Sequence, residues 1–297
     1  MNFEAFVKEI EKNKWNVWGV EVYENGQLTH EFGDTRENIH EIYSATKTIL
    51  SVAVGIAYDR GLIDLEKSLL EYIPVEKRNN MSVEQKNTFE KITIHRLLTM
   101  SVGDFPFRPE GNSYLDFSLA CLVSNPDKKV FNYSNISAYL VGVALSNAIG
   151  EDLGMFIEKN IFEPLHITKY EYGRCPEGYF YGASLMKLTV HDLSQIGLLL
   201  YNGGIYEGKR ILSENYVKKA TSVQQINKEG GYGYLIWKYR DGFSINGKWK
   251  QRCYVLPQRN MIITYLAHIE DDSQDLQLSM EKNILDTFRV LRRGKLQ

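Results

Sequence analysis

The spacing of apolar and polar residues changes along this chain, and each change predicts a different kind of element. In residues 3–10, apolar side chains recur at helical spacing and predict a surface helix with one inward face. Residues 15–23 and 27–32 are strand-like, and Asn25-Gly26 between them is the strongest short-range signal of a β-hairpin. The inward face of the first helix consists of Phe3, Phe6 and Ile10.

The segment that follows the hairpin is strongly apolar. Residues 46–58 are apolar on nearly every side, which is typical of a helix buried inside a protein, and Gly61 is expected to cap its C-terminal end. Residues 75–91 are polar and indicate a loop. A mostly helical middle follows, with Thr93 as the N-cap of its first helix. Further helices are predicted at 114–123, 137–149, 153–161, 191–201 and 213–220.

From residue 232 the pattern becomes strand-like again. Strands are predicted at 232–239, 251–256 and 261–267, separated by Gly and Pro turns, and a helix ends the chain. The inward stripe of that last helix is predicted to consist of Met280, Ile284, Phe288 and Leu291.

Strands at both ends with helices between them predict an α+β fold that is α/β sandwich-like. One antiparallel sheet would be assembled from the N- and C-terminal segments and flanked by the terminal helices, with an inserted, mostly helical lobe. We expect a single domain over residues 1–297, with the sheet lobe at about 1–60 and 230–297 and the helical lobe at about 61–229. A cleft between sheet and lobe is the expected place for a site.

Composition excludes several classes of protein. The 35 basic and 37 acidic residues give a net charge of -2 without a long like-charge block, which argues against nucleic acid or an anionic membrane as partner. The 3 cysteines are odd in number and form no Cys-x-x-Cys pair, so neither a disulfide framework nor a zinc site is expected. No apolar run is long enough to span a bilayer, and the N-terminus lacks a signal-peptide pattern, so we expect a cytoplasmic location.

Ser44 and Lys47 carry the first candidate chemistry. They lie one helical turn apart at the start of the buried helix, so the hydroxyl and the amine can meet. A buried lysine is costly unless it is paired or neutralised, and a function is one reason to keep it. The same Ser-x-x-Lys spacing recurs at 184–187 and 279–282, but only Ser44 opens a buried helix. The alternative is a helix-capping serine beside a lysine whose ammonium reaches solvent.

A second motif, Tyr133-Ser134-Asn135, precedes another apolar helix. In an extended segment, side chains two residues apart point to the same side, so Tyr133 and Asn135 can enter one pocket. The motif is weak by itself, because the hairpin turn at residues 23–25 also matches it. The alternative for Tyr133 is a half-buried tyrosine with a hydrogen-bonded hydroxyl.

The two motifs together resemble those of the penicillin-recognising serine hydrolases. The closest branch contains class C β-lactamases, D-alanyl-D-alanine carboxypeptidases, D-aminopeptidases and related esterases. The resemblance runs from Trp15 to the final helix and includes the segments 92–103, 188–193 and 232–234. It implies a β-lactamase/transpeptidase-like fold and an acyl-enzyme on Ser44, with no cofactor and no metal.

One segment departs from the family pattern. The family usually carries Lys-Thr-Gly or His-x-Gly on the strand that faces the serine. Here residues 243–251 read Phe-Ser-Ile-Asn-Gly-Lys-Trp-Lys-Gln, with no basic residue before the glycine, which looks like the variant of esterase and amidase-like members. This argues against recognition of a β-lactam or D-Ala-D-Ala carboxylate. Lys248 and Lys250 are expected to be solvated charges rather than substitutes.

A serine needs a base to become a nucleophile, and Lys47 and Tyr133 are the candidates. Their unperturbed pKa values of about 10.4 and 10 are too high for proton transfer at neutral pH. Burial would lower the pKa of the lysine, and a neighbouring ammonium would lower that of the tyrosine. Which of the two is the base stays open at this point.

Three further residues are expected to contact the substrate. Asn135 would hydrogen-bond the substrate amide or Lys47. A backbone N–H near Asn246 or Gly247 would bind the oxyanion together with the N–H of Ser44. Aromatic residues near the expected rim are predicted to pack between the lobes. They are Phe105, Phe107, Trp237 and Trp249.

The sequence therefore predicts a serine hydrolase that acts on a small ester, amide or peptide through an acyl-enzyme. Within the same chemistry, the alternative is a β-lactamase or D,D-carboxypeptidase. An alternative of another class is a non-catalytic descendant that binds a ligand or partner in the same cleft. The oligomeric state is left open.

Overall fold

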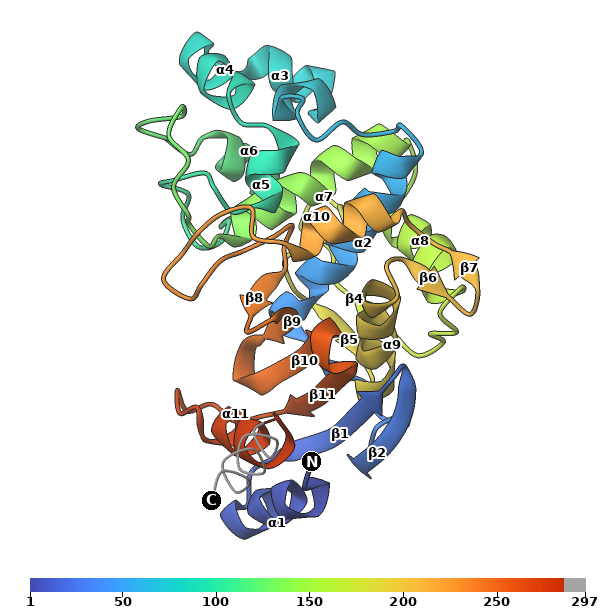
Figure 1. Cartoon of the computed structure of the whole chain (residues 1–297). Coiled ribbons are helices and arrows are strands. Elements are labelled where there is room, and N and C mark those ends of the chain that lie inside the picture. The colour runs from blue at the N-terminus through green and yellow to red at the C-terminus, as the bar shows by residue number, and fades with distance from the viewer. Residues whose placement is uncertain (286–297) are drawn as a thin grey trace.

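The computed structural model describes residues 1–285 of the chain (Figure 1), so the predicted stripe positions Phe288 and Leu291 lie outside the described residues. The helices are α1 (Phe3–Asn13), α2 (Thr46–Asp59), α3 (Val75–Asn80), α4 (Val83–Glu90), α5 (Ile94–Leu98), α6 (Tyr114–Leu119), α7 (Asn135–Ile149), α8 (Leu153–Ile157), α9 (Val190–Tyr201), α10 (Glu214–Thr221) and α11 (Asp275–Met280). The strands are β1 (Val17–Glu24), β2 (Gln27–Gly33), β3 (His40–Glu41), β4 (Glu171–Tyr172), β5 (Met186–Leu188), β6 (Ile205–Tyr206), β7 (Lys209–Arg210), β8 (Trp237–Tyr239), β9 (Gly242–Gly247), β10 (Gln251–Leu256) and β11 (Met261–Ala267).

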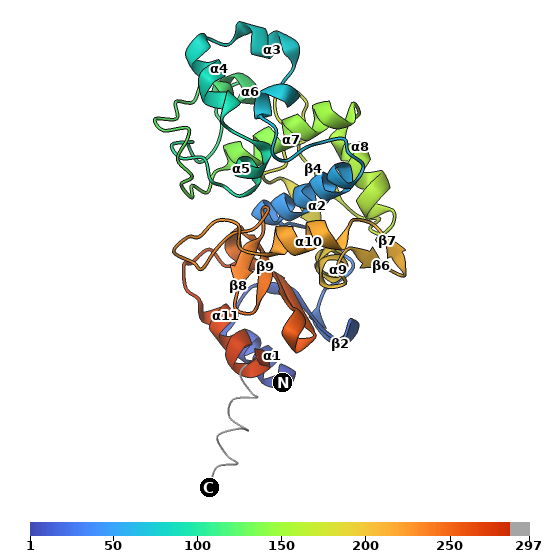
Figure 2. The ribbon, with the colours of Figure 1, turned by 45° about the horizontal axis from the view of Figure 1, so that its top comes forward.

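Six strands form the main sheet, in the order β2-β1-β11-β10-β9-β8. All neighbouring strands run antiparallel, and the pairing of β1 with β11 joins the two ends of the chain. The sheet lies between α1 and α11 on one side and the other helices on the opposite side (Figure 2). The predicted α+β fold, with one antiparallel sheet built from both termini, is confirmed.

The sheet separates two hydrophobic cores. Successive side chains of β10 point into opposite cores. Cys253 belongs to the large core under the helices, and Tyr254 belongs to the smaller core beneath α1 and α11. Phe6 and Ile10 of α1 are buried in the smaller core, and Phe3 packs against it. The predicted inward face of the first helix is therefore confirmed.

The predicted hairpin between β1 and β2 is confirmed as well. Both turn residues, Asn25 and Gly26, have left-handed backbones with φ of 53° and 78°. This is the pattern of a turn whose twist matches that of the two strands it joins. Glu24 and Gln27 pair directly across it.

The prediction of a loop over residues 75–91 is wrong, because α3 and α4 lie there. Ser82 and Gln85 cap α4 reciprocally: the Ser82 hydroxyl accepts from the Gln85 N–H at 3.1 Å, and the Gln85 side chain accepts from the Ser82 N–H at 2.7 Å. Only Phe89 of α4 is buried. A helix with a single apolar anchor has too weak a hydrophobic period to stand out in the sequence.

The prediction of a strand over residues 232–239 is wrong in its first half, since β8 begins only at Trp237. Tyr232 forms only isolated bridges, to Gln225 and Trp237, and the backbone after it bonds to helices. Tyr234 N–H donates to the Ala220 carbonyl and Leu235 N–H to the Leu98 carbonyl, each at 2.9 Å. This segment therefore ties the sheet to the helical part of the molecule.

Helix packing links the two predicted lobes. α2 packs against α7 and α10, whereas α9 packs against β1, β10 and β11. These contacts cross the division expected from the sequence, whose lobe boundaries stay a prediction. Within residues 1–285, no single helix is long and apolar enough to cross a membrane, and the pair 135–149 and 153–162 passes that test only as two segments bent by 83°.

The hairpin turn gives a direct test of the backbone argument. An alanine Cβ at Gly26 would meet no atom within 4 Å, so the cost of Gly26→Ala comes from its left-handed φ alone. We expect the free energy of unfolding to fall by about 1 kcal/mol, measured by urea denaturation. The control is Gly103→Ala, where φ is not left-handed and the nearest atom is 3.8 Å away. Equal losses of stability in both variants would contradict the account.

Candidate active site

Ser44 lies in a short 3-10 turn that leads into α2. The residue before it, Tyr43, has a left-handed φ of 48°, which is unusual for a side chain of that size. The Thr46 hydroxyl donates to the Tyr43 carbonyl at 2.7 Å and holds the turn closed. This turn leaves Ser44 partly exposed at the wall of a cleft, while α2 behind it is buried from Thr46 onward.

Lys47 lies directly beneath Ser44 and is 1% exposed. Its Nζ lies 3.0 Å from the Ser44 Oγ, 2.7 Å from the Asn135 Oδ1 and 2.7 Å from the Ala183 carbonyl oxygen. Within residues 1–285, no carboxylate forms an ion pair with this amine. Burial lowers the pKa of Lys47 to about 7, so a large fraction is neutral at physiological pH.

The three contacts of Lys47 suit a neutral amine. A neutral amine has two N–H donors and one lone pair, and two of its neighbours, the Asn135 amide oxygen and the Ala183 carbonyl, are acceptors. Both N–H groups are therefore satisfied by the protein. The lone pair is left to face the third neighbour, the Ser44 hydroxyl, which can then donate its proton to the lysine.

Asn135 is held in place at both ends of its side chain. Ser134 is the N-cap of α7, its hydroxyl accepting from the Ile136 N–H at 3.0 Å, so Asn135 is the first residue of that helix. The Asn135 oxygen accepts from Lys47, and the side chain also hydrogen-bonds the Tyr181 hydroxyl. Of the two contacts expected for Asn135, the structure contains the one to Lys47.

Tyr133 reaches the other side of Ser44. Its hydroxyl hydrogen-bonds Ser44, and the Lys47 Nζ lies 5.0 Å from its ring centroid. Burial raises the pKa of Tyr133 to about 12, which outweighs the lowering effect of the Ser44 hydrogen bond. The direction is opposite to the one expected from the sequence. At neutral pH the phenol keeps its proton, whereas the amine of Lys47 can accept one.

The cleft above these groups has a volume of about 440 Å³. Five of the six predicted site residues line it, and Lys47 lies beneath its floor. Gly247 brings the end of β9 against the turn before Ser44, since a Cβ there would lie 2.1 Å from the Ile42 carbonyl oxygen. The lining residues are Tyr43, Ser44, Phe107, Tyr133, Asn135, Ser184, Glu229, Trp237, Asn246, Gly247, Lys248 and Arg252.

Arg252 and Glu229 also line the cleft, and sequence reasoning missed both. Arg252 lies on β10 directly across from Asn246 of β9. The family motif has its basic residue on the strand that carries the glycine, whereas here the return strand of the same hairpin carries one. The register of that hairpin was the signal that would have found it.

Of the two lysines near Gly247, Lys248 lines the cleft and Lys250 is not among its lining residues. Lys248 is exposed, as predicted, with its Nζ 4.2 Å from the centroid of the Trp249 ring. Lys250 is half-buried rather than solvated, and it donates to the carbonyl of Ser273. Of the aromatic residues expected near the rim, Phe107 and Trp237 line the cleft.

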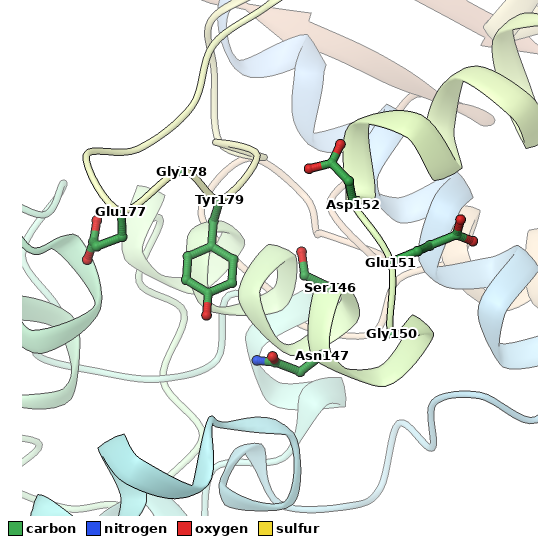
Figure 3. A pocket seen from close by; sticks show the side chains of 8 residues that line it. All are labelled: Ser146, Asn147, Gly150, Glu151, Asp152, Glu177, Gly178 and Tyr179. Carbon is green, nitrogen blue, oxygen red and sulfur yellow. The ribbon is translucent and has the colours of Figure 1, made fainter.

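A second hollow of about 570 Å³ lies at the C-terminal end of α7 (Figure 3). Two of its carboxylates already have partners within the protein. Asp152 binds the Arg174 guanidinium through two hydrogen bonds of 2.6 and 2.9 Å, and Glu177 accepts a hydrogen bond from the Leu115 N–H at 2.7 Å. Ser146 in this hollow donates to the Gly142 carbonyl at 3.0 Å. Within residues 1–285, no group of three or more His, Cys, Asp or Glu side chains is arranged to hold a metal ion.

Comparison with known proteins identifies the family to which the chain belongs. The family model described as Beta-lactamase matches residues 11–281. No curated protein matches the sequence. Among solved structures, a proposed 6-aminohexanoate-dimer hydrolase from Bacillus anthracis is similar, with a TM-score of 0.79 at 20% identity, covering 97% of this chain and 82% of that one.

Two further structures share the fold. A penicillin binding protein from Bacillus halodurans has a TM-score of 0.73 at 16% identity, covering 93% of this chain and 99% of that one. A class C beta lactamase from Rhodobacter sphaeroides has a TM-score of 0.70 at 14% identity, covering 97% of this chain and 99% of that one. At these identities the likeness establishes the fold alone.

The pH dependence of stability tests the state of Lys47. Its pKa is about 10.4 in an unfolded chain and about 7 in the folded protein. Between pH 7 and 10 the unfolded state therefore binds more protons, and this residue makes stability rise with pH. Lys47→Met removes that contribution, so the stability of the variant relative to wild type should fall by up to about 1.4 kcal/mol per pH unit.

Urea denaturation of both proteins at pH 7, 8 and 9 measures this difference. The control is Lys187→Met, which removes an exposed lysine from another Ser-x-x-Lys segment; its ion pair with Glu171 raises the pKa of the lysine. The control should show no such fall over this range. A Lys47→Met difference that stays constant with pH would contradict the burial of a largely neutral amine.

Proposed function

This chain belongs to the Beta-lactamase family, and from that premise we propose that it is a serine hydrolase that cleaves a small amide, ester or peptide through an acyl-enzyme on Ser44. The observation that carries the proposal is the 3.0 Å contact between the Ser44 Oγ and the Lys47 Nζ. That amine is buried with a pKa of about 7, so it is a base close to its working pH.

In the first step, neutral Lys47 takes the proton of the Ser44 hydroxyl while Oγ attacks the carbonyl carbon of the substrate. A C–O bond forms, and the electron pair of the carbonyl double bond moves to its oxygen. The backbone N–H groups of Ser44 and Gly247 are the proposed donors to that oxyanion. The close approach of β9 to the turn before Ser44 supports this pairing.

In the second step, the tetrahedral intermediate breaks its bond to the leaving group. The departing nitrogen or oxygen takes the proton held by Lys47, with the Tyr133 hydroxyl as a relay. A phenol with a pKa of about 12 is protonated at neutral pH, which supports a role as a donor and not as the resting base. Water then attacks the acyl carbon while Lys47 takes its proton. The second tetrahedral intermediate breaks its C–O bond to Ser44, Lys47 returns the proton to the Ser44 Oγ, and the carboxylic acid product leaves.

Asn135 acts in this proposal as a positioning residue. Its bond to Lys47 fixes the direction of the amine, and its own hydrogen bond to Tyr181 fixes the amide. The predicted contacts of Asn135, Asn246 and Gly247 with substrate belong to the proposal as well. So do a small-molecule substrate, the absence of nucleic acid or a membrane as partner, and a cytoplasmic location.

Two alternatives remain distinct from this proposal. A β-lactamase or D,D-carboxypeptidase would use the same acyl-enzyme, and one neighbour is named as a class C beta lactamase and another as a penicillin binding protein. A non-catalytic descendant would keep the cleft without turnover. The reactivity of Ser44 separates all three.

Intact-mass analysis of wild type and Ser44→Ala tests the nucleophile. Both proteins are exposed in turn to a fluorophosphonate, a penicillin and p-nitrophenyl acetate. We expect an adduct or turnover with wild type only, and a loss of turnover of at least about a thousandfold in Ser44→Ala, since the nucleophile and its base act as a unit. An adduct with penicillin that is slowly released would favour the β-lactamase alternative.

The matched control is Ser279→Ala. Ser279 has the same Ser-x-x-Lys spacing, but it lies on α11 and donates to Glu9 on the opposite face of the sheet. This variant should react as wild type does. Full activity in Ser44→Ala would refute the proposal. A folded wild type that reacts with none of the three probes would favour the non-catalytic descendant that binds a ligand in the cleft.

A further inference from the structure

The cleft at Ser44 contains charged side chains of both signs that are not paired with each other. Glu229 reaches it from the loop that follows α10, and Arg252 reaches it from β10. In the part of the chain that the structure describes, no ion pair engages either side chain. Surface charges in other parts of the fold are commonly paired, as Asp152 is with Arg174.

Arg252 is fixed at the end of β9. Its Nη1 donates to the Gly247 carbonyl at 2.6 Å and to the Gln251 carbonyl at 2.8 Å, and the guanidinium also hydrogen-bonds the Tyr254 hydroxyl. These contacts leave donors of the planar fork for a ligand in the cleft. A carboxylate is the group that such a fork binds best.

Both charges act on the position where the substrate bond would lie. Arg252 lowers the pKa of the Tyr133 phenol and Glu229 raises it, so each lies within electrostatic reach of that ring. The Tyr133 hydroxyl in turn hydrogen-bonds the Ser44 hydroxyl. The reacting serine therefore lies in the field of a cation and an anion at once.

Asn246 adds a polar group that the protein does not satisfy. Its Oδ1 is buried at the cleft and has no hydrogen-bond partner among the described residues. An acceptor of this kind is costly to leave unpaired, and a rotation of the Asn246 side chain toward the cleft would let an N–H of the ligand satisfy it. Amides have such an N–H, whereas simple esters lack it.

We propose that this site takes a short zwitterionic amide, with its carboxylate bound by Arg252, its ammonium bound by Glu229 and an N–H donated to Asn246. The inference rests on the proposed function, because it takes the Ser44 cleft as the substrate site. The cleft volume of about 440 Å³ limits the ligand to a small molecule. Lys248 is not assigned the carboxylate, because its ammonium lies over the Trp249 ring.

Calorimetric titration of Ser44→Ala tests the charges without requiring turnover. The ligands are L-alanyl-L-alanine, D-alanyl-D-alanine and β-alanyl-β-alanine, each as the free zwitterion, the N-acetyl form, the C-terminal amide and the doubly blocked form. We expect at least one zwitterion to bind about tenfold more tightly than either singly blocked form. This difference in affinity should become smaller in 0.5 M salt, because salt screens the attraction between partly solvated charges.

Variants assign each charge to its residue in the same titration. Glu229→Gln should abolish only the preference for a free amine, and Arg252→Gln only the preference for a free carboxylate. Arg252→Lys keeps the charge and should keep part of that preference, which guards against a folding defect in the glutamine variant. Glu110→Gln, a carboxylate outside the cleft, should change nothing.

Two results would overturn this inference. One is that no zwitterion binds more tightly than its doubly blocked form, and the other is that Lys248→Gln removes the carboxylate preference while Arg252→Gln keeps it. The proposed function fails separately. If the zwitterions bind as expected but wild type neither forms an adduct nor hydrolyses them, the charge assignment stands and the hydrolase does not.

Discussion

The contact between the Ser44 hydroxyl and the amine of Lys47 depends on burying a lysine that has no carboxylate partner within residues 1–285. The fold meets this constraint by bringing three distant segments together: α2 carries the lysine, the start of α7 supplies the Asn135 oxygen, and the segment before β5 supplies the Ala183 carbonyl. Neutral acceptors satisfy the N–H groups of the amine without stabilising a positive charge as a carboxylate would. Desolvation then decides its protonation state, and the amine becomes a base beside the serine.

The same burial divides the proton chemistry between two residues. It lowers the pKa of Lys47 to about 7 and raises that of Tyr133 to about 12, because desolvation disfavours the charged form of each group. One side chain is therefore able to accept a proton at neutral pH, and the other retains its own. The sequence motifs place both groups near Ser44, and burial at the floor of the cleft shifts their pKa values in opposite directions.

Much of the fold could be predicted from the sequence. The correct predictions concern elements that are determined by residues close together in the chain. Asn25-Gly26 predicts its hairpin from backbone conformation alone, and the apolar run of α2 predicts a buried helix. The loop predicted at residues 75–91 is instead α3 and α4, since α4 buries only Phe89. The strand predicted from residue 232 begins at 237, because the backbone N–H groups of residues 234 and 235 bond to helices and not to a neighbouring strand.

Part of the candidate site could also be predicted, because some of its residues belong to short sequence motifs. Ser44, Lys47, Tyr133 and Asn135 come from short motifs, and the structure brings them together. Arg252 was missed because its place depends on the pairing of β9 with β10, and Glu229 because it lies on a loop. The rise in the Tyr133 pKa was missed because burial is a property of the packed chain and not of a motif.

The protonation state of Lys47 is the central claim, and NMR of protein labelled with ¹³C at lysine Cε measures it directly. The Lys47→Met variant identifies the signal by its absence. The account predicts that this signal titrates with a midpoint near pH 7, well below the value of about 10.4 for an unperturbed lysine. A Lys47 signal with a midpoint near the unperturbed value of about 10.4 would contradict the account.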